Sequence, residues 1–210
     1  MTRFKAVISD FGGVLTTPLI ESFLAYQRES GIALEDLGLA MGRLMEEDGG
    51  RHPLFELEKG LMTEEEFTRR LGAELGREIS SMRDTYFEHL HPNEPMISYL
   101  RGLRGEGLRL ALLTNNVREW EPLWRAKLPD VDELFEVIVD SGFVGMRKPE
   151  PEIYELTLER LGGGLRFDEC LFLDDIEVNC DAARELGMTA VRFHETEQAI
   201  AELESALGRG

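Results

Sequence analysis

Carboxylate side chains follow apolar runs at two distant places in the sequence. Asp10 comes directly after the run AVIS, and Asp174 and Asp175 come directly after the run CLFL. Mg²⁺ prefers a few protein oxygens completed by water and substrate phosphate, so three carboxylates that meet would suit this ion. The remaining oxygen of Asp10 could attack phosphorus and form an aspartyl-phosphate. These residues therefore indicate metal-assisted phosphoryl transfer.

A hydroxyl group and an ammonium group would complete a phosphate pocket. Thr114 and Asn115 follow the apolar run LRLALL, and Lys148 precedes a proline at the first turn of a predicted helix in GMRKPEPEIY. The charge of Lys148 could balance charge that develops on the transferred group. Taken alone, Lys148 would be a solvated surface residue, and Thr114 and Asn115 would cap the following helix. For Asn115 we favour this structural role.

The apolar runs predict strands that are buried on both faces of a sheet. They span residues 4–9, 108–113, 134–139, 170–173 and 189–193. Segments of helical period alternate with the later runs, at 117–127, 150–161, 178–186 and 195–207. This alternation predicts an α/β fold with a parallel sheet core and helices on both faces. Ligands of such sheets bind beyond the carboxyl ends of the strands, where the polar residues described above lie.

The interval from residue 17 to residue 93 differs, because its helical period continues without a convincing strand. Thr63 and Glu66 have the spacing of a capping box at the start of one helix. The sequence therefore predicts a core domain of residues 1–16 and 94–210 and a helical insert of residues 17–93.

The composition of the 210-residue chain excludes some classes of function. Its formal net charge of −18 disfavours a general nucleic-acid binder, which needs clustered lysine and arginine. Cys170 and Cys180 form no CxxC pair, which indicates packing residues in a reducing compartment. No apolar segment has the length of a membrane span or signal peptide. We expect a cytoplasmic protein without nucleic-acid or membrane partners.

A homodimer is a further expectation that the sequence leaves open. Trp120 and Trp124 lie four residues apart in a segment of helical period. They could form one apolar helix face, enclose a substrate or contact a second copy of the chain.

Four motifs occur in a fixed order along the chain: SDFGGV, LLTNN, RKPEPEIY and LFLDD. With them the chain resembles the haloacid dehalogenase (HAD) superfamily, which is dominated by phosphatases. The resemblance covers nearly the whole chain, and it implies a Rossmann-like core in which residues 17–93 form a cap that closes over the substrate. DFGGVL and GMRKPEPEIY are similar to the subgroup of glucose-1-phosphate phosphatase-like proteins and the N-terminal phosphatase domain of soluble epoxide hydrolase.

The resemblance implies roles for individual residues. For catalysis, the resemblance implies Asp10 as the nucleophile together with Thr114 and Lys148. For substrate binding, it implies Thr114, Asn115 and Lys148. The cofactor would be Mg²⁺, held by Asp10, the backbone carbonyl of Gly12, Asp175 directly, and Asp174 directly or through water. Apart from the resemblance, Asn179 lies one helical turn beyond Asp175 and could orient it or be a surface residue. Arg147 could help to bind phosphate or stay solvated, and it is left out of the catalytic set. The substrate would be a small phosphorylated metabolite, whose identity the motifs do not reveal.

Gly12 departs from the family pattern. Phosphatases that this chain resembles have a second aspartate here, which protonates the leaving alcohol and then activates water. General acid catalysis is worth roughly 10²- to 10⁴-fold, so its loss favours substrates with weakly basic leaving groups. The alternative is an acid supplied by the insert. Candidates in the insert are Glu46, Glu47, Asp48 and His52.

Two other functions compete with the phosphatase interpretation. A catalytically weak HAD-like protein could bind a phosphorylated ligand or a protein partner, with Gly12 as the mark of lost activity. A dehalogenase could use Asp10 on carbon, but that chemistry needs no metal, and the acidic pair Asp174 and Asp175 disfavours it.

Overall fold

The computed structural model describes residues 3–79 and 82–209, and a parallel sheet lies at its centre. The strands are β1 (Ala6–Ser9), β2 (Arg109–Thr114), β3 (Val137–Asp140), β4 (Cys170–Asp174) and β5 (Thr189–Arg192). Their order across the sheet is β3-β2-β1-β4-β5, and every pairing between neighbours is parallel. The chain moves from one side of β1 to the other between β3 and β4. The carboxyl ends of β1 and β4 therefore meet at a topological switch point.

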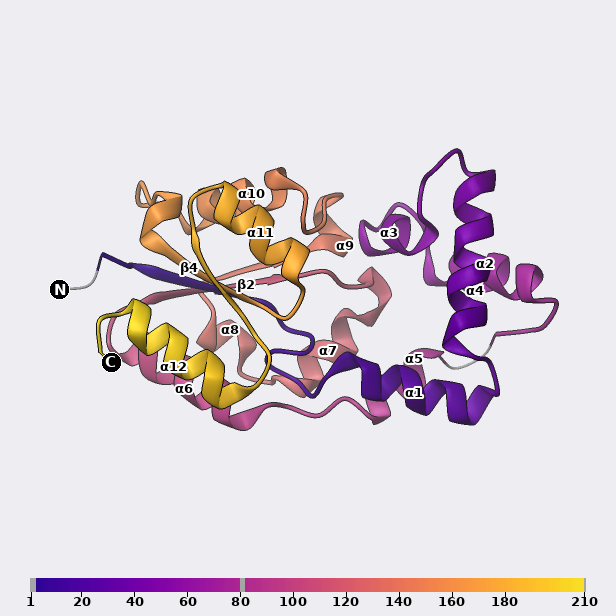
Figure 1. Cartoon of the computed structure of the whole chain (residues 1–210), viewed down its shortest axis with the longest axis horizontal. Coiled ribbons are helices and arrows are strands. Elements are labelled where there is room, and N and C mark those ends of the chain that lie inside the picture. The colour runs from indigo at the N-terminus through magenta and orange to yellow at the C-terminus, as the bar shows by residue number, and fades with distance from the viewer. Residues whose placement is uncertain (1–2, 80–81, 210) are drawn as a thin grey trace.

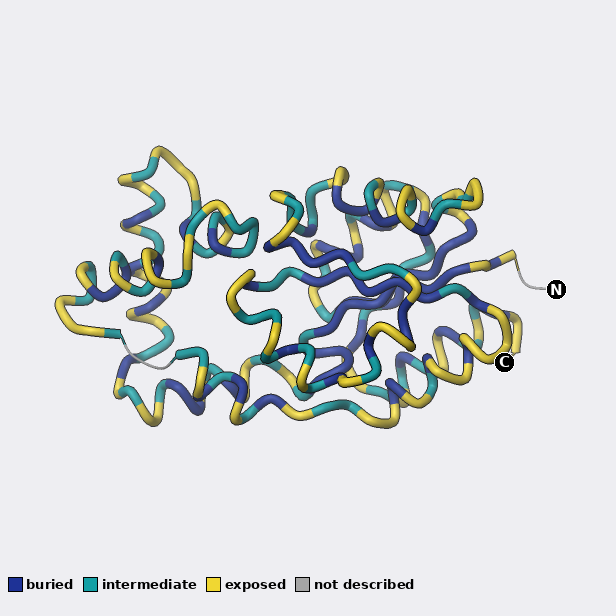
Figure 2. The backbone as a smooth tube through the Cα atoms, turned by 180° about the vertical axis from the view of Figure 1, so that it is seen from behind, coloured by how far each residue is buried: buried dark blue, intermediate teal, exposed yellow. Residues whose placement is uncertain are grey.

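Helices cover both faces of the sheet (Figure 1). They and the short 3₁₀ turns η1 and η2 are α6 (Glu94–Gly105), η1 (Arg118–Trp120), α7 (Glu121–Lys127), α8 (Val131–Leu134), α9 (Ser141–Val144), α10 (Pro151–Leu161), η2 (Phe167–Glu169), α11 (Glu177–Glu185) and α12 (Thr196–Ala206). Side chains alternate along each strand, so Val7 packs with α6 and α12 while Ile8 packs with α10 and α11. The buried backbone is concentrated in these strands (Figure 2). The predicted α/β fold is confirmed.

Two segments begin differently from their prediction. Leu134 ends α8, so the third strand starts only at Val137. The segment 117–127 starts as the 3₁₀ turn η1, which ends at Trp120, and Trp124 lies in the helix α7 that follows. Trp124 is fully buried beside the sheet, whereas Trp120 is half-buried and also contacts side chains of the 17–93 segment. Both tryptophans therefore contact one apolar cluster of the core, and Trp120 contacts that of the 17–93 segment as well.

The segment between β1 and α6 is helical and lies beyond the carboxyl ends of the strands (Figure 1). Its helices are α1 (Leu19–Ser30), α2 (Leu34–Glu47), α3 (Pro53–Glu58), α4 (Glu64–Leu75) and α5 (Met82–Glu88). They pack around a separate apolar cluster that includes Leu37, Phe67 and Leu71. At the start of α4, Thr63 Oγ1 accepts a hydrogen bond from the backbone N–H of Glu66.

The chain enters and leaves this helical segment at one place. The N–H of Thr17 donates to the carbonyl of His91 at 2.8 Å, and the N–H of Asn93 donates to the carbonyl of Leu15 at 2.8 Å. The two passages therefore run side by side. Over the described ranges, no helix combines the length and the apolar character that crossing a membrane requires.

Candidate active site

Asp10 is fixed at the end of the central strand. Its N–H donates to the carbonyl of Leu173 at 2.8 Å, which extends the pairing of β1 with β4. Its Oδ1 lies 2.8 Å from Nζ of Lys148 and accepts a hydrogen bond from the N–H of Phe11 at 2.7 Å. None of the described residues donates a hydrogen bond to Oδ2. One carboxylate oxygen is therefore held while the other is available.

Asp174 lies behind Lys148 and is completely buried. Its Oδ2 lies 2.6 Å from Nζ of Lys148. Its Oδ1 accepts hydrogen bonds from the N–H of Ile176 at 2.9 Å and from Nδ2 of Asn179 at 3.0 Å. Asn179 is buried and contacts Asp174, so the prediction that it orients Asp175 is wrong. Asp174 and Asn179 together position the ammonium group of Lys148.

The predicted carboxylates do meet. Asp10, Asp174 and Asp175 each offer an oxygen atom, and these atoms lie within 4.8 Å of one another. Burial raises the pKa of Asp10 well above its ordinary value, and the charge of Lys148 offsets part of that rise. Burial and the neighbouring Asp174 raise the pKa of Asp175 to about 6. Burial lowers the pKa of Lys148, but the carboxylates outweigh it, so the net pKa is raised.

These carboxylates fit a divalent cation. Asp10, Asp174 and Asp175 lie close together, and the ammonium group of Lys148 contacts only Asp10 and Asp174, which leaves an excess of negative charge. Oxygen donors in small number, with room for water and phosphate, are the set that Mg²⁺ takes.

Gly12 and Gly13 make room for different neighbouring side chains. Gly13 has a φ of 76°, and a Cβ there would overlap the carboxylate of Asp175. Glycine is therefore required for the turn and for the approach of Asp175. A Cβ on Gly12 would lie 3.1 Å from the methyl carbons of Leu19. Leu19 thus fills the space beside the position where the resembling phosphatases carry their second aspartate.

Asn115 has a structural role that differs from the predicted helix cap. Its Nδ2 donates to the carbonyl of Lys148 at 3.0 Å, and its Oδ1 accepts from the N–H of Lys148 at 2.8 Å. The following 3₁₀ turn has Val117 at its N-cap and no side-chain cap. Lys148 itself lies in the turn after α9, ahead of the helix that starts at Pro151. Asn115 therefore fixes the backbone that carries Lys148.

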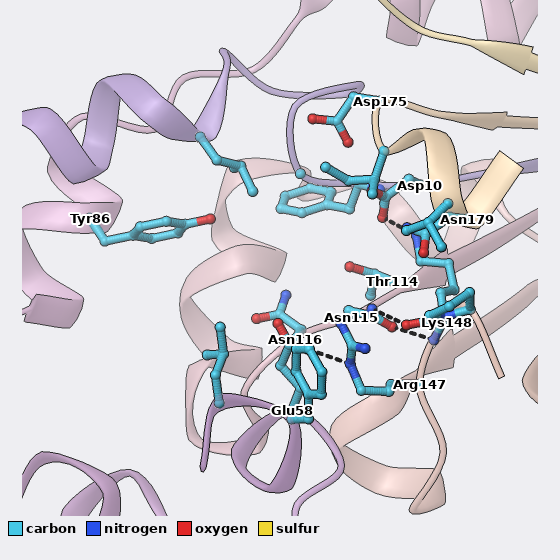
Figure 3. Close-up of a pocket in the computed structure, with 18 of the residues that line it drawn as sticks. Asp10, Glu58, Tyr86, Thr114, Asn115, Asn116, Arg147, Lys148, Asp175 and Asn179 are labelled. Carbon is cyan, nitrogen blue, oxygen red and sulfur yellow. Dashed lines mark hydrogen bonds and ion pairs between the residues drawn. The ribbon is translucent and has the colours of Figure 1, made fainter. Parts of the chain in front are cut away.

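A cavity of about 600 Å³, which we call the site cavity, lies between the sheet and the helical insert. The predicted site residues that line it are Asp10, Gly12, Thr114, Asn115, Lys148 and Asp175. Asp174 is set back behind Lys148 and does not line it. Figure 3 shows Asp10, Thr114 and Lys148 on one side of this space and Tyr86 and Glu58 on the other.

Arg147, which was left out of the predicted catalytic set, also lines the site cavity, as do Glu58 and Tyr86, which no motif indicated. Arg147 donates from Nε to Oε2 of Glu58 at 2.7 Å, and its guanidinium carbon lies 3.9 Å from the ring centroid of Phe55. Burial raises the pKa of Glu58, and Arg147 offsets part of the rise. Tyr86 directs its hydroxyl into the cavity (Figure 3), and burial raises its pKa. Only Arg147, which adjoins Lys148 in a motif, had a signal in the sequence.

The candidate acids that the sequence suggested in the insert are wrong. None of Glu46, Glu47, Asp48 and His52 lines the site cavity. Asp48 instead pairs with Arg70, with 2.8 Å between Oδ2 and Nη1. Glu46 and Glu47 end α2, and Asp48 and His52 lie in the loop between α2 and α3. Glu58, at the end of α3, is the insert carboxylate that the structure brings to the cavity.

Comparisons with known proteins agree with this geometry. A family model described as haloacid dehalogenase-like hydrolase matches residues 4–187. A sesquiterpene phosphatase from Aspergillus oryzae is 29% identical over 99% of this chain and 98% of its own length. Bifunctional epoxide hydrolase 2 from Rattus norvegicus is 27% identical over 95% of this chain, which spans 38% of that protein. A HAD family enzyme from Bacteroides thetaiotaomicron, solved with magnesium and inorganic phosphate, has a TM-score of 0.66 at 25% identity, covering 91% of this chain and 94% of that one.

Proposed function

Because this chain belongs to the haloacid dehalogenase-like hydrolases, we propose that it is a Mg²⁺-dependent phosphatase that hydrolyses small phosphate monoesters through an aspartyl-phosphate on Asp10. The single observation that carries the proposal is the state of the Asp10 carboxylate. Lys148 and the N–H of Phe11 hold one oxygen, and the other oxygen is available beside a cavity of about 600 Å³. A positioned carboxylate of this kind is suited to attack phosphorus.

The metal ligands in this proposal are Asp10, Asp175 and the carbonyl of Gly12. Both oxygens of Asp174 already have protein partners, so we assign it to holding Lys148 and to contacting the ion through water. When bound, Mg²⁺ would neutralise charge on the phosphate oxygens. Gly13 supports this set because it allows Asp175 to approach the turn.

We assign phosphate binding to Thr114 and Lys148. Both line the site cavity, Thr114 at the end of β2 and Lys148 in the turn after α9. Asn115 contributes by fixing the backbone of Lys148 and is therefore a positioning residue. The helical segment 17–93 would act as the cap over a core of residues 1–16 and 94–210. Support for this comes from Ser141, whose Oγ donates to the carbonyl of Glu58 at 2.6 Å and so ties α3 to the sheet side of the cavity.

Proton transfer falls to Glu58 in this proposal. The free oxygen of Asp10 attacks phosphorus, the ester P–O bond breaks, and the leaving alkoxide takes a proton from the Glu58 carboxyl. Water then attacks the phosphorus and breaks its bond to Asp10, while the Glu58 carboxylate accepts a proton from that water. Inorganic phosphate is released and both carboxylates are restored. Support for Glu58 comes from its place on the cavity wall across from Asp10 (Figure 3) and from the burial that raises its pKa.

This role for Glu58 favours the second of the two expectations that Gly12 raised, an acid supplied by the insert. The first, a preference for weakly basic leaving groups, predicts fast hydrolysis of acetyl phosphate and very slow hydrolysis of an alkyl phosphate. The cytoplasmic location and the homodimer stay predictions.

Hydrolysis of acetyl phosphate and of a panel of phosphate monoesters with Mg²⁺ tests the proposal. We expect turnover by the wild type and a loss of about 10⁴-fold or more in Asp10→Asn, because the nucleophile is removed. Beryllium trifluoride, which mimics an aspartyl-phosphate, should bind the wild type with Mg²⁺ and not the variant. Binding of inorganic phosphate without turnover of any ester would favour the alternative, a protein that binds a phosphorylated ligand, which the glycine at position 12 supports.

A further inference from the structure

A second cavity lies inside the helical insert. It has a volume of about 340 Å³, and we call it the apolar chamber. Its walls come mainly from apolar side chains of α1, α2, α3 and α4 together with residues that follow β2. They include Leu37, Met41, Leu57, Phe67, Leu71 and Trp120. The volume is in the range of pockets that hold small organic ligands, about 300 to 1,000 Å³.

The apolar chamber adjoins the site cavity. The residues that line both are Leu19, Phe23, Leu54, Glu58, Tyr86, Asn115 and Asn116. In Figure 3, two of these shared residues, Tyr86 and Glu58, lie at the left and at the bottom of the site cavity, and Asp10 lies at its right. A ligand whose phosphate lies beside Asp10 can therefore extend past these residues into the chamber.

Leu19 adds apolar surface to the passage where the two cavities adjoin. Its methyl carbons lie 3.1 Å from where a Cβ of residue 12 would be, and the same side chain lines both cavities. An aspartate at position 12 would bring a charge and its water to this passage. Glycine at position 12 and leucine at position 19 together leave an apolar surface next to the nucleophile.

The part of the chamber that is lined by leucine, methionine and phenylalanine favours hydrocarbon over water. A buried water molecule needs about two to four polar partners, and the leucine, methionine and phenylalanine side chains of these walls supply none. Removing apolar surface of a ligand from water is favourable in proportion to the area removed. Polar side chains also line the chamber: Glu58, Glu64, Thr68, Tyr86, Asn115, Asn116 and Trp120. Among them, the Nε1 of Trp120 is buried and has no hydrogen-bond partner in the described part of the chain.

We infer that the apolar chamber binds the organic group of the substrate, so that the physiological esters are amphiphilic phosphate monoesters with an extended apolar alcohol. This inference rests on the proposed phosphatase function and deepens it. Taking a methylene group to be about as large as a water molecule, roughly 30 Å³, the chamber has room for about eleven carbon atoms. The indole N–H of Trp120 can donate to one oxygen atom on that group.

Binding of n-alkylphosphonates tests the inference without requiring turnover. These compounds, from methyl to dodecyl, carry the phosphate-like head and cannot be hydrolysed as esters. Calorimetry with the Mg²⁺-loaded wild type, below the concentration at which the probes form micelles, should show affinity that rises about fourfold for each added methylene. We expect the rise to stop once the chain fills the chamber.

Two variants on helix α2 form a matched pair for the same titration. Met41 lines the chamber and is half-buried, whereas Leu39 is 56% exposed and does not line it. In Met41→Trp the larger side chain fills the chamber, so the gain per methylene, measured relative to methylphosphonate in the same variant, should disappear. Leu39→Trp should retain the gain. Circular dichroism of both variants reports whether the helices are intact.

The outcomes separate the two proposals. A gain per methylene that Met41→Trp removes supports the chamber, whether or not any ester is hydrolysed. Affinity that does not depend on chain length overturns the inference, even if acetyl phosphate is hydrolysed and the phosphatase function stands. A gain that survives unchanged in a folded Met41→Trp variant also overturns it, because the chain then binds elsewhere.

Discussion

Lys148 and Asp10 form a buried ion pair, with 2.8 Å between Nζ and Oδ1. Lys148 also pairs with Asp174, so Lys148→Met would leave two buried carboxylates without their cation. We expect the free energy of unfolding of the metal-free protein to fall by about 3 to 5 kcal/mol, as when one partner of a buried pair is removed. Activity should fall at least about 10²-fold, since charge on the transferred group is no longer balanced. Denaturant unfolding and initial rates measure these effects.

Mg²⁺ binding by the same variant distinguishes a folded site from a collapsed one. The carboxylates that lose Lys148 attract a cation more strongly, so the affinity of Lys148→Met for Mg²⁺ should equal or exceed that of the wild type. Lys59→Met is the control, because Lys59 of the insert pairs with Glu150 of the core and both side chains are partly exposed, at 21% and 34%. It should cost less than about 1 kcal/mol. Equal losses in the two variants would contradict the buried-pair argument.

Gly13→Ala tests the contact between the turn after β1 and Asp175. The new methyl group would overlap the Asp175 carboxylate, which must move away from the metal position. We expect the affinity for Mg²⁺ to fall about ten- to a hundredfold, as when the support of a metal ligand is lost. Calorimetric titration of the metal measures it.

Gly145→Ala provides the control for Gly13→Ala. Gly145 has a similar φ of 73°, but a Cβ there meets nothing within 4 Å. The variant therefore incurs the backbone strain, about 1 to 2 kcal/mol, without disturbing a carboxylate. Unchanged Mg²⁺ affinity is expected, and a matching loss in both variants would show that strain alone explains the effect.

The buried carboxyl group of Asp140 should make the stability of the fold depend on pH, independently of the metal site. Burial raises its pKa from 3.8 to about 6, although the N–H groups of Gly142 and Trp124 donate to its carboxylate. The folded chain then binds more protons than the unfolded chain between these values. The stability that Asp140 contributes is fully present below pH 3.8 and is lost as the pH rises through about 6.

Asp140→Asn isolates that contribution. The free energy of unfolding of the wild type, relative to the variant, should fall by roughly 2 to 3 kcal/mol as the pH rises from about 4 to 7. Other groups titrate equally in both proteins and cancel in the difference. Denaturant curves at each pH provide the measurement, and a difference that stays flat would refute the raised pKa.

Glu58→Gln tests the proposed proton donor. Glutamine keeps a hydrogen-bonding group for Arg147 but cannot give up a proton. We expect hydrolysis of an alkyl phosphate to slow by roughly 10²-fold or more, because its alkoxide needs protonation, while acetyl phosphate slows much less. Glu56→Gln on the same helix, which does not line the cavity, should behave as the wild type. Equal slowing of both substrates would remove Glu58 from the proton-transfer role.

The fold could be predicted from the sequence because its signals are local. Runs such as LRLALL and CLFL are buried on both faces of the sheet, and Asp10 and Asp175 lie at strand ends that topology brings together. The start of the third strand was missed because Leu134 is as apolar in α8 as it would be in a strand. An apolar run does not by itself show where a short helix gives way to extended backbone.

Part of the site could not be predicted because it depends on packing between distant segments. Glu58 and Tyr86 reach the cavity only through the way α3 and α5 lie over the sheet. Asn115 contacts the backbone of Lys148, a residue 33 positions away, which no local pattern encodes. The grouping of the core carboxylates could be predicted from the sequence, because the carboxyl ends of strands in a parallel sheet share one edge.

Thr17 and His91 are joined by a backbone hydrogen bond of 2.8 Å at the point where the chain leaves the α/β part and returns to it. Bridging so small a separation with a short peptide linker carries a low entropic penalty. Helices α1 to α5 could therefore be excised, or replaced by those of another protein, without rebuilding the sheet. Evolution could diversify the alcohol that is recognised by exchanging one contiguous stretch of gene while Asp10 and Lys148 remain in place.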